Sequence, residues 1–177
     1  MISIVEQSHE FLIPALHRSA VCIDATMGHG KDSLFFLKHN VKKVYAYEIQ
    51  KDVYDKTVAK VDDKRLVAYL KGHETMDEDV KEEVDGIVFN FGYCPGKDEA
   101  ITTMANTSLM AVKKGLSLLK VKGRMVLVMY PHDKGLIEAT TIEDYLCEVD
   151  HNKYYIEKRT QLNQSYSPYM IAIQRLK

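Results

Sequence analysis

The stretch VCIDATMGHGKDSLFFLKHNVKKVYAYEIQ, residues 21–50, decides the fold. It opens with an apolar strand, continues through a glycine-containing turn and a helix with apolar residues at helical spacing, and closes with a second apolar strand. Gly28 and Gly30 allow the chain to turn sharply and to approach a ligand closely. Glu48 ends the second strand, where a carboxylate can accept two hydrogen bonds from a ribose diol. This layout predicts one half of a nucleotide-cofactor site.

The turn narrows the choice of cofactor. A dinucleotide-binding turn needs a third glycine, but Ser33 stands at that position, and the Gly-Lys-Ser/Thr of a Walker A loop is absent from the sequence. Asp24, at the end of the first strand, would repel a pyrophosphate, whereas it suits a cofactor that carries an ammonium and a sulfonium. Residues 24–30 resemble the D-x-G-x-G-x-G loop of class I S-adenosylmethionine (SAM) methyltransferases, with Thr26 in place of the first glycine. Glycine pairs also occur in strand–helix turns for steric reasons, so the loop alone does not decide.

Size and composition set further bounds. The 177 residues, 46% hydrophobic and 28% charged, fit one globular domain over residues 1–177. A formal net charge of −1 speaks against a large nonspecific nucleic-acid surface but allows a local basic patch. No apolar run approaches the ~20 residues of a membrane span, and the first residues lack the basic region of a signal peptide. The cysteines are scattered and give neither a disulfide framework nor a zinc spacing. We therefore expect a cytoplasmic protein with no membrane partner and no metal.

Strand and helix patterns alternate along the rest of the chain. After a helix around 4–16, we expect strands near 21–24, 43–48, 66–70, 85–89 and 123–130, and helices near 31–40, 50–61, 76–83, 101–119 and 135–148. Such alternation predicts a parallel sheet with helices on both faces. Two final strand-like runs, 154–160 and 169–174, are separated by a short polar segment and should pair antiparallel. The expected fold is α/β and Rossmann-like, as in class I methyltransferases: a mostly parallel seven-stranded sheet with an antiparallel C-terminal strand.

A second motif follows the fourth expected strand. Asn90-Phe91-Gly92-Tyr93-Cys94-Pro95-Gly96 resembles the N/D-P-P-Y/F/W signature of amino-group methyltransferases, with Phe91 and Gly92 where the prolines would be. The Asn90 oxygen could accept the N–H hydrogens of an amine and align its lone pair with a methyl–sulfur bond. A Tyr93 ring could stack on a flat base, which is worth about 1–3 kcal/mol. The alternative is a plain strand exit in which the asparagine caps a turn.

Two histidines lie after other expected strands, at the edge where ligands bind in such sheets. His73 follows the third strand and could face adenine or substrate, although it could equally be a surface histidine. His132 lies in Tyr130-Pro131-His132-Asp133-Lys134-Gly135 after the fifth strand, where it is a candidate proton acceptor or simply an exposed turn residue.

Together these pieces resemble one family, the small bacterial proteins known as putative rRNA methylases. The resemblance rests on D-A-T-M-G-H-G-K-D at 24–32, Y-E-I-Q at 47–50, G-H-E at 72–74, F-N-F-G-Y-C-P-G-K-D at 89–98, T-T at 102–103, Y-P-H-D-K-G at 130–135 with Glu138, and N-Q-S-Y-S-P at 163–168. The family more usually has Asn near His29, Leu at Cys94 and Gly at Lys97.

This resemblance implies N-methylation of the 5-aminomethyl group of 2-thiouridine at the tRNA wobble position. It also implies SAM as the cofactor, the anticodon arm of tRNA as the substrate, and a homodimer. We expect the catalytic residues to be Asn90, Tyr93 and His132. We expect the cofactor contacts to come from Asp24, Thr26, Met27, Gly28, Gly30, Asp32, Glu48, Gln50, His73 and Asn90.

Other functions stay open at this point. The same cofactor site could serve a methyltransferase that acts on rRNA or on a small amine. A protein that binds SAM without catalysis is a second alternative, although the Asn90–Tyr93 loop speaks against it. NAD-dependent oxidoreduction is disfavoured by Ser33 and by the antiparallel ending of the sheet.

Overall fold

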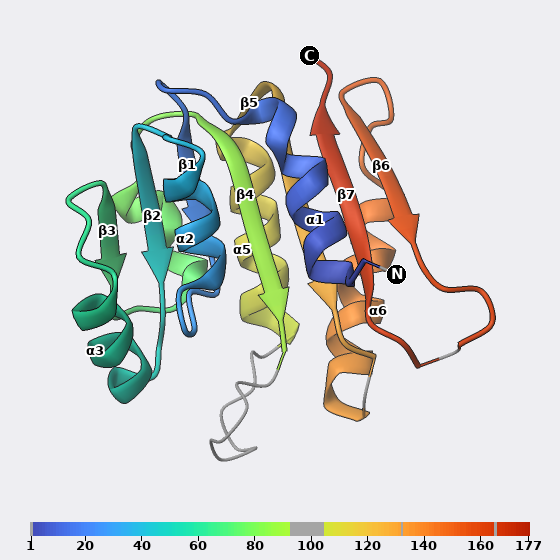
Figure 1. Ribbon diagram of the computed structural model, residues 1–177. Helices are drawn as coiled ribbons and strands as arrows, with labels where there is room; N and C mark the ends of the chain where they lie inside the picture. The colour runs from blue at the N-terminus through green and yellow to red at the C-terminus, as the bar shows by residue number, and fades with distance from the viewer. Residues whose placement is uncertain (1, 93–104, 132, 165) are drawn as a thin grey trace.

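A single sheet forms the centre of the computed structural model, which describes residues 2–92, 105–131, 133–164 and 166–177 (Figure 1). The strand order is β3-β2-β1-β4-β5-β7-β6. The strands are β1 Val21–Asp24, β2 Lys43–Tyr47, β3 Leu66–Tyr69, β4 Val84–Phe91, β5 Leu119–Met129, β6 Tyr154–Arg159 and β7 Tyr169–Arg175. Strands β1 to β5 are parallel, and β7 runs antiparallel to both of its neighbours, β5 and β6. The predicted sheet is confirmed.

Helices cover both faces of this sheet. They are α1 Ile4–Leu12, α2 Lys31–Lys38, α3 Lys51–Lys60, α4 Met76–Asp79, α5 Ala105–Leu118 and α6 Asp133–Cys147, with short 3-10 helices at Ile13–Ala15 and His73–Thr75. In Figure 1, α1 and α2 lie in front of the sheet and α5 and α6 lie behind it. No helix in the described ranges is long and apolar enough to cross a membrane.

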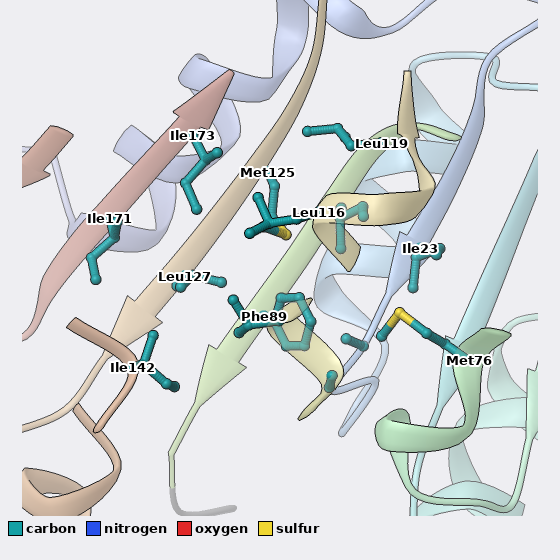
Figure 2. Packing of buried hydrophobic residues seen from close by; sticks show 14 of the residues in the cluster. Ile23, Met76, Phe89, Leu116, Leu119, Met125, Leu127, Ile142, Ile171 and Ile173 are labelled. Atoms are coloured by element: carbon teal, nitrogen blue, oxygen red, sulfur yellow. The ribbon is translucent and has the colours of Figure 1, made fainter. Parts of the chain in front are cut away.

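The central strands are buried on both faces, which explains their continuous apolar runs. Alternate residues point to opposite sides, so each strand feeds two cores. In front, Cys22, Val88 and Val126 pack with side chains of α1 and α2. Behind, Ile23, Phe89 and Met125 belong to the larger core with residues of α5 and α6, where Figure 2 shows Leu116 and Ile142 packed with them.

Several predicted boundaries differ slightly from the structure, and two of these differences have a clear physical cause. The helix predicted over 76–83 ends at Asp79, because Val80 takes an extended backbone conformation that leads into β4. Strand β5 begins at Leu119 rather than near 123. Leu119 pairs with Val84, and the pairing then shifts so that Arg124 lies opposite Gly86. The extra residues form an irregularity that precedes the regular part of β5.

The sheet topology positions the candidate site. Because β1 to β5 are parallel, the loops that follow them lie along one edge of the sheet. The chain goes to β2 on one side of β1 and to β4 on the other, so the strand order reverses between β1 and β4. Open α/β sheets bind ligands in the crevice at such a reversal. A ligand site is therefore expected among the residues that follow β1, β2 and β4.

Candidate active site

The turn after β1 is held from both sides by backbone hydrogen bonds. Ala25 N donates to Val88 O at 2.9 Å, and Met27 N donates to Tyr47 O at 2.8 Å, so the turn is tied to β4 and β2. Gly30 has φ of 76° and directly precedes α2. A Cβ at Gly30 would lie 2.8 Å from Thr57 Cγ2, so glycine is required there for conformation and for space. The backbone of this turn is thus fixed in place before any ligand arrives.

Glu48 lies at the end of β2 and faces this turn. Its side chain is largely buried, and its two oxygens accept from Gly28 N at 3.1 Å and from Gln50 N at 2.8 Å. A carboxylate has about four lone-pair positions, so these two bonds fix its orientation and leave acceptor capacity for two further donors. A ribose diol offers two hydroxyl donors. The structure thus places Glu48 beside the glycine turn, as the sequence predicts, and its contact with the ribose stays a prediction.

The residues after Glu48 offer an apolar surface and a spare acceptor. The apolar side chain of Ile49 is 51% exposed and follows Glu48 directly. It could pack against a flat ring. Sequence reasoning missed Ile49, although its place after Glu48 was a usable signal. Gln50 precedes α3, and its buried Oε1 has no hydrogen-bond partner among the described residues. A buried acceptor without a donor is a place where a ligand N–H could bind.

Asp24 is sealed inside the protein. It has no exposed surface; one oxygen accepts from Ser33 Oγ at 2.6 Å and the other from Thr26 N at 3.3 Å. Burial, followed by the neighbouring charge of Asp32, raises the pKa of Asp24 from 3.8 to about 7. Its contacts with Thr26 and Ser33 tie the ends of the glycine turn together. Its predicted contact with a cofactor stays a prediction.

Asp32 lies in the first turn of α2, and its side chain is nearly buried. His9 of α1 contacts it, with 2.6 Å between His9 Nε2 and Asp32 Oδ1. His9 was not predicted as a site residue, because the contact joins two helices whose packing the sequence does not reveal. The structure thus brings two carboxylates, Asp24 and Asp32, close together, whereas Glu48 contacts the backbone of Gly28 and Gln50.

The expected acceptor residues are described only in part. Asn90 lies at the end of β4, half-buried, and its backbone N donates to Thr26 Oγ1 at 2.7 Å. Thr26 therefore joins the predicted cofactor turn to the predicted acceptor residue. Tyr130, which follows β5, packs its ring against Gly92. Tyr93 and His132 lie outside the described residues.

His73 is buried below the turn rather than exposed. Its Nδ1 lies 3.0 Å from Ala25 O, and its ring meets the edges of Phe89 and Phe91. Burial lowers the pKa of His73, so the neutral ring is favoured. In this position His73 supports the backbone next to Asp24, and a contact with adenine stays a prediction.

The donor set fits an adenosine that carries an amino-acid tail. Glu48 with Gln50 suits the ribose and base, and the Asp32 carboxylate suits an ammonium, because opposite charges attract strongly at buried sites. No group of three His, Cys, Asp or Glu side chains among the described residues could hold a metal ion. The arrangement could therefore bind SAM at the crevice between β1 and β4, with Asn90 on the acceptor side.

Comparison with known proteins agrees with this geometry. The family model described as "Putative rRNA methylase" matches residues 44–175. This chain is a member of that family.

Relatives of this putative rRNA methylase cover nearly its whole length. A chloroplastic tRNA (mnm(5)s(2)U34)-methyltransferase of Arabidopsis thaliana is 30% identical over 183 residues, covering 94% of this chain and 67% of that protein. A structure described as "a putative methyltransferase" from Streptococcus mutans, in complex with SAH, is 32% identical, with a TM-score of 0.91 and 99% of both chains covered. A structure described as a "putative rRNA-methylase" from Clostridium thermocellum is 27% identical, with a TM-score of 0.93 and coverage of 99% of this chain and 98% of that chain. These structures share the fold described above.

Proposed function

We propose that this protein is a SAM-dependent methyltransferase that methylates the amino nitrogen of 5-aminomethyl-2-thiouridine at the tRNA wobble position. The enzyme class and the cofactor follow from membership of the family and from the relative in complex with SAH. The substrate is the more specific part of the proposal. The observation that carries it is the 30% identity, over 94% of this chain, to a protein named for mnm(5)s(2)U34, the nucleoside that methylation of 5-aminomethyl-2-thiouridine would form.

The cofactor would be held by residues of the β1, β2 and β4 loops. The Glu48 carboxylate, fixed by the backbone of Gly28 and Gln50, would accept from the ribose hydroxyls. Thr26, Met27 and Gly30 shape the turn beneath the cofactor, and Gln50 and His73 are proposed for the adenine side. When bound, SAM supplies a methyl group on a positively charged sulfonium.

The acceptor would be a neutral amine held by Asn90. An alkyl amine titrates near pH 10, so keeping it unprotonated at pH 7 costs about 4 kcal/mol. Desolvation and a neighbouring positive charge both lower the pKa of an amine and reduce that cost. The Asn90 side-chain oxygen would accept an N–H hydrogen of the amine and direct its lone pair toward the methyl carbon. We propose Tyr93 as a stacking surface for the base and His132 as the proton acceptor.

The test uses SAM with a tritiated methyl group and separate pools of undermodified tRNA and rRNA. After incubation with purified protein, the nucleosides are separated and identified by mass spectrometry. Label on 5-aminomethyl-2-thiouridine is the expected result. Label in rRNA alone would keep the enzyme class and replace the substrate, and the family description favours rRNA as the second candidate. Label in neither pool, with SAM still bound, would turn attention to a small amine or to a non-catalytic role.

A homodimer that binds the anticodon arm is part of this proposal, and it rests on the family resemblance. A net charge near zero gives a single protomer little general attraction for RNA. A binding face built across two protomers would gather the basic residues that one protomer spreads out. Light scattering after gel filtration, with and without a tRNA anticodon stem–loop, measures both the dimer and the complex.

A further inference from the structure

His9 is held in a fixed position between two helices. Its Nε2 lies 2.6 Å from Asp32 Oδ1, and the exposed fractions of the two side chains are 20% and 7%. Its ring also stacks on Phe35 of α2, with 3.9 Å between the ring centroids and 9° between the planes. The contact with the Asp32 carboxylate and the stacking on Phe35 together fix the orientation of the imidazole ring. Both contacts are made with α2, the helix that follows the glycine turn.

The surroundings of Asp32 are unusually acidic for a buried site. Asp24, fully buried on β1, is close enough for the charge of Asp32 to raise its pKa. Burial, followed by the charge of Asp32, also raises the pKa of Tyr130, which approaches from the β5 side. Among the described residues, His9 is the one basic side chain within ion-pair distance of either carboxylate. Asp32 thus carries a negative charge at a nearly buried position with one basic partner, and a ligand cation would stabilise that charge further.

We propose that His9 is a positioning residue for the methionine end of the cofactor. It holds the Asp32 carboxylate so that Asp32, beside Asp24, receives the cofactor's ammonium group. This inference rests on the proposed function, because it takes the crevice to be the SAM site. His9 itself does not touch the cofactor and acts through Asp32.

The helix that carries His9 lies outside the residues matched by the family model, which begin at 44. Helix α1 packs against β5 and β7, and its capping box of Ser3 and Glu6 fixes its start. The helix therefore has a second role besides covering the front core. It brings a basic side chain to a site that is otherwise built from the β1 and β2 loops.

A pair of ligands separates this role from a merely structural one. S-adenosylhomocysteine (SAH) has the amino-acid end, whereas 5′-methylthioadenosine retains the adenosine and the thioether but lacks that end. Titration calorimetry would compare both ligands on the wild type, His9→Ala and His9→Gln. We expect His9→Ala to weaken SAH binding about tenfold and to change methylthioadenosine binding by less than about twofold. His9→Gln keeps a donor for Asp32 and should restore part of the SAH affinity.

The control variant is His39→Ala. His39 also contacts Phe35, with 4.5 Å between the ring centroids, but it lies at the far end of α2 from Asp32. It therefore reports the loss of packing around Phe35 without the contact to the carboxylate. We expect His39→Ala to bind both ligands like the wild type, and thermal melting would verify that each variant is folded.

Several results would overturn the inference. Equal losses for SAH and methylthioadenosine in His9→Ala would mean that His9 only supports the fold, and unchanged SAH affinity would mean that it has no role. If His9→Ala does not fold, the single variant Asp32→Asn is titrated with the same two ligands. A loss of affinity that is equal for SAH and methylthioadenosine would contradict the proposal. A wild type that binds neither ligand would instead refute the proposed function and, with it, the premise.

Discussion

The two acidic regions on either side of the glycine turn use their carboxylates in opposite ways. Glu48 receives two backbone N–H groups and retains acceptor capacity that faces the turn. Asp24 has no exposed surface, and its oxygens are bonded to Ser33 and Thr26 of the same loop. The difference shows that an acid at a strand end can serve a ligand or serve the loop that binds it. Sequence position alone does not distinguish the two.

The largest effect should come from the pH dependence of stability on the Asp24 side. Because its pKa is raised from 3.8 to about 7, folded Asp24 keeps its proton where the unfolded chain has lost it. Stability should therefore fall as the pH rises from about 4 to about 7, and then level off, by at most about 4 kcal/mol. Urea unfolding of the wild type and of Asp24→Asn across this range measures the difference. Parallel pH profiles for the two proteins would contradict the assignment.

Next in size is the loss of cofactor binding on the Glu48 side. Glu48→Ala removes the proposed acceptor for the ribose and the partner of two backbone N–H groups. We expect SAH affinity to drop at least about 100-fold, since two hydrogen bonds to a charged group, at about 1.5–3 kcal/mol each, contribute about 3 kcal/mol or more. Calorimetry measures the loss. Asp55→Asn, an exposed acid paired with Lys51 on α3, is the matched control and should leave affinity unchanged.

Substitutions in the glycine turn between these two regions should have an intermediate effect, which we expect on the free energy of unfolding. Gly30→Ala combines a φ of 76° with a Cβ 2.8 Å from Thr57 Cγ2, so we expect a loss of about 2–3 kcal/mol in unfolding free energy. Gly28→Ala shares the positive φ, but its Cβ would come no closer than 3.8 Å to Thr26 O. Its loss should be about 1–2 kcal/mol. Chemical denaturation of both variants would measure the cost of the contact with Thr57 Cγ2. Equal losses of unfolding free energy in the two variants would show that this contact costs nothing.

The smallest effect should follow from the link between the turn and the acceptor side. Thr26→Val removes the hydroxyl that accepts from Asn90 N at 2.7 Å. Stability should decrease by about 1 kcal/mol. If Asn90 positions the amine, turnover should fall more than SAM affinity. Thr26→Ser, which keeps the hydroxyl, should recover most of the turnover, and failure of that rescue would argue against the hydrogen bond.

Much of the fold was predictable because its signals are local. The apolar run of β1, the helix after Gly30 and the β6–β7 hairpin each follow from the spacing of neighbouring residues. The end of α4 was not predicted, because Val80 leaves the helix to lead into β4. The start of β5 was missed because it depends on a shift in pairing with β4.

The candidate site was also predictable where its signals are local, and not where they depend on how helices pack. Gly28, Gly30 and Glu48 lie together as their positions at strand ends imply. The contact between His9 and Asp32 and the complete burial of Asp24 depend on how α1 and α2 pack on the sheet, which no local pattern encodes. Tyr93 and His132 keep their predicted roles as predictions.

The position of β7 has a consequence for how this protein is made. Strand β7 is synthesised after β6 but lies between β5 and β6. While the chain emerges from the ribosome, β6 has no neighbour to pair with, and the edge of β5 stays open until Tyr169–Arg175 have been added. Open strand edges are sites of aggregation. The part of the sheet made by β5, β7 and β6, on the right in Figure 1, must therefore close late, once β7 has emerged.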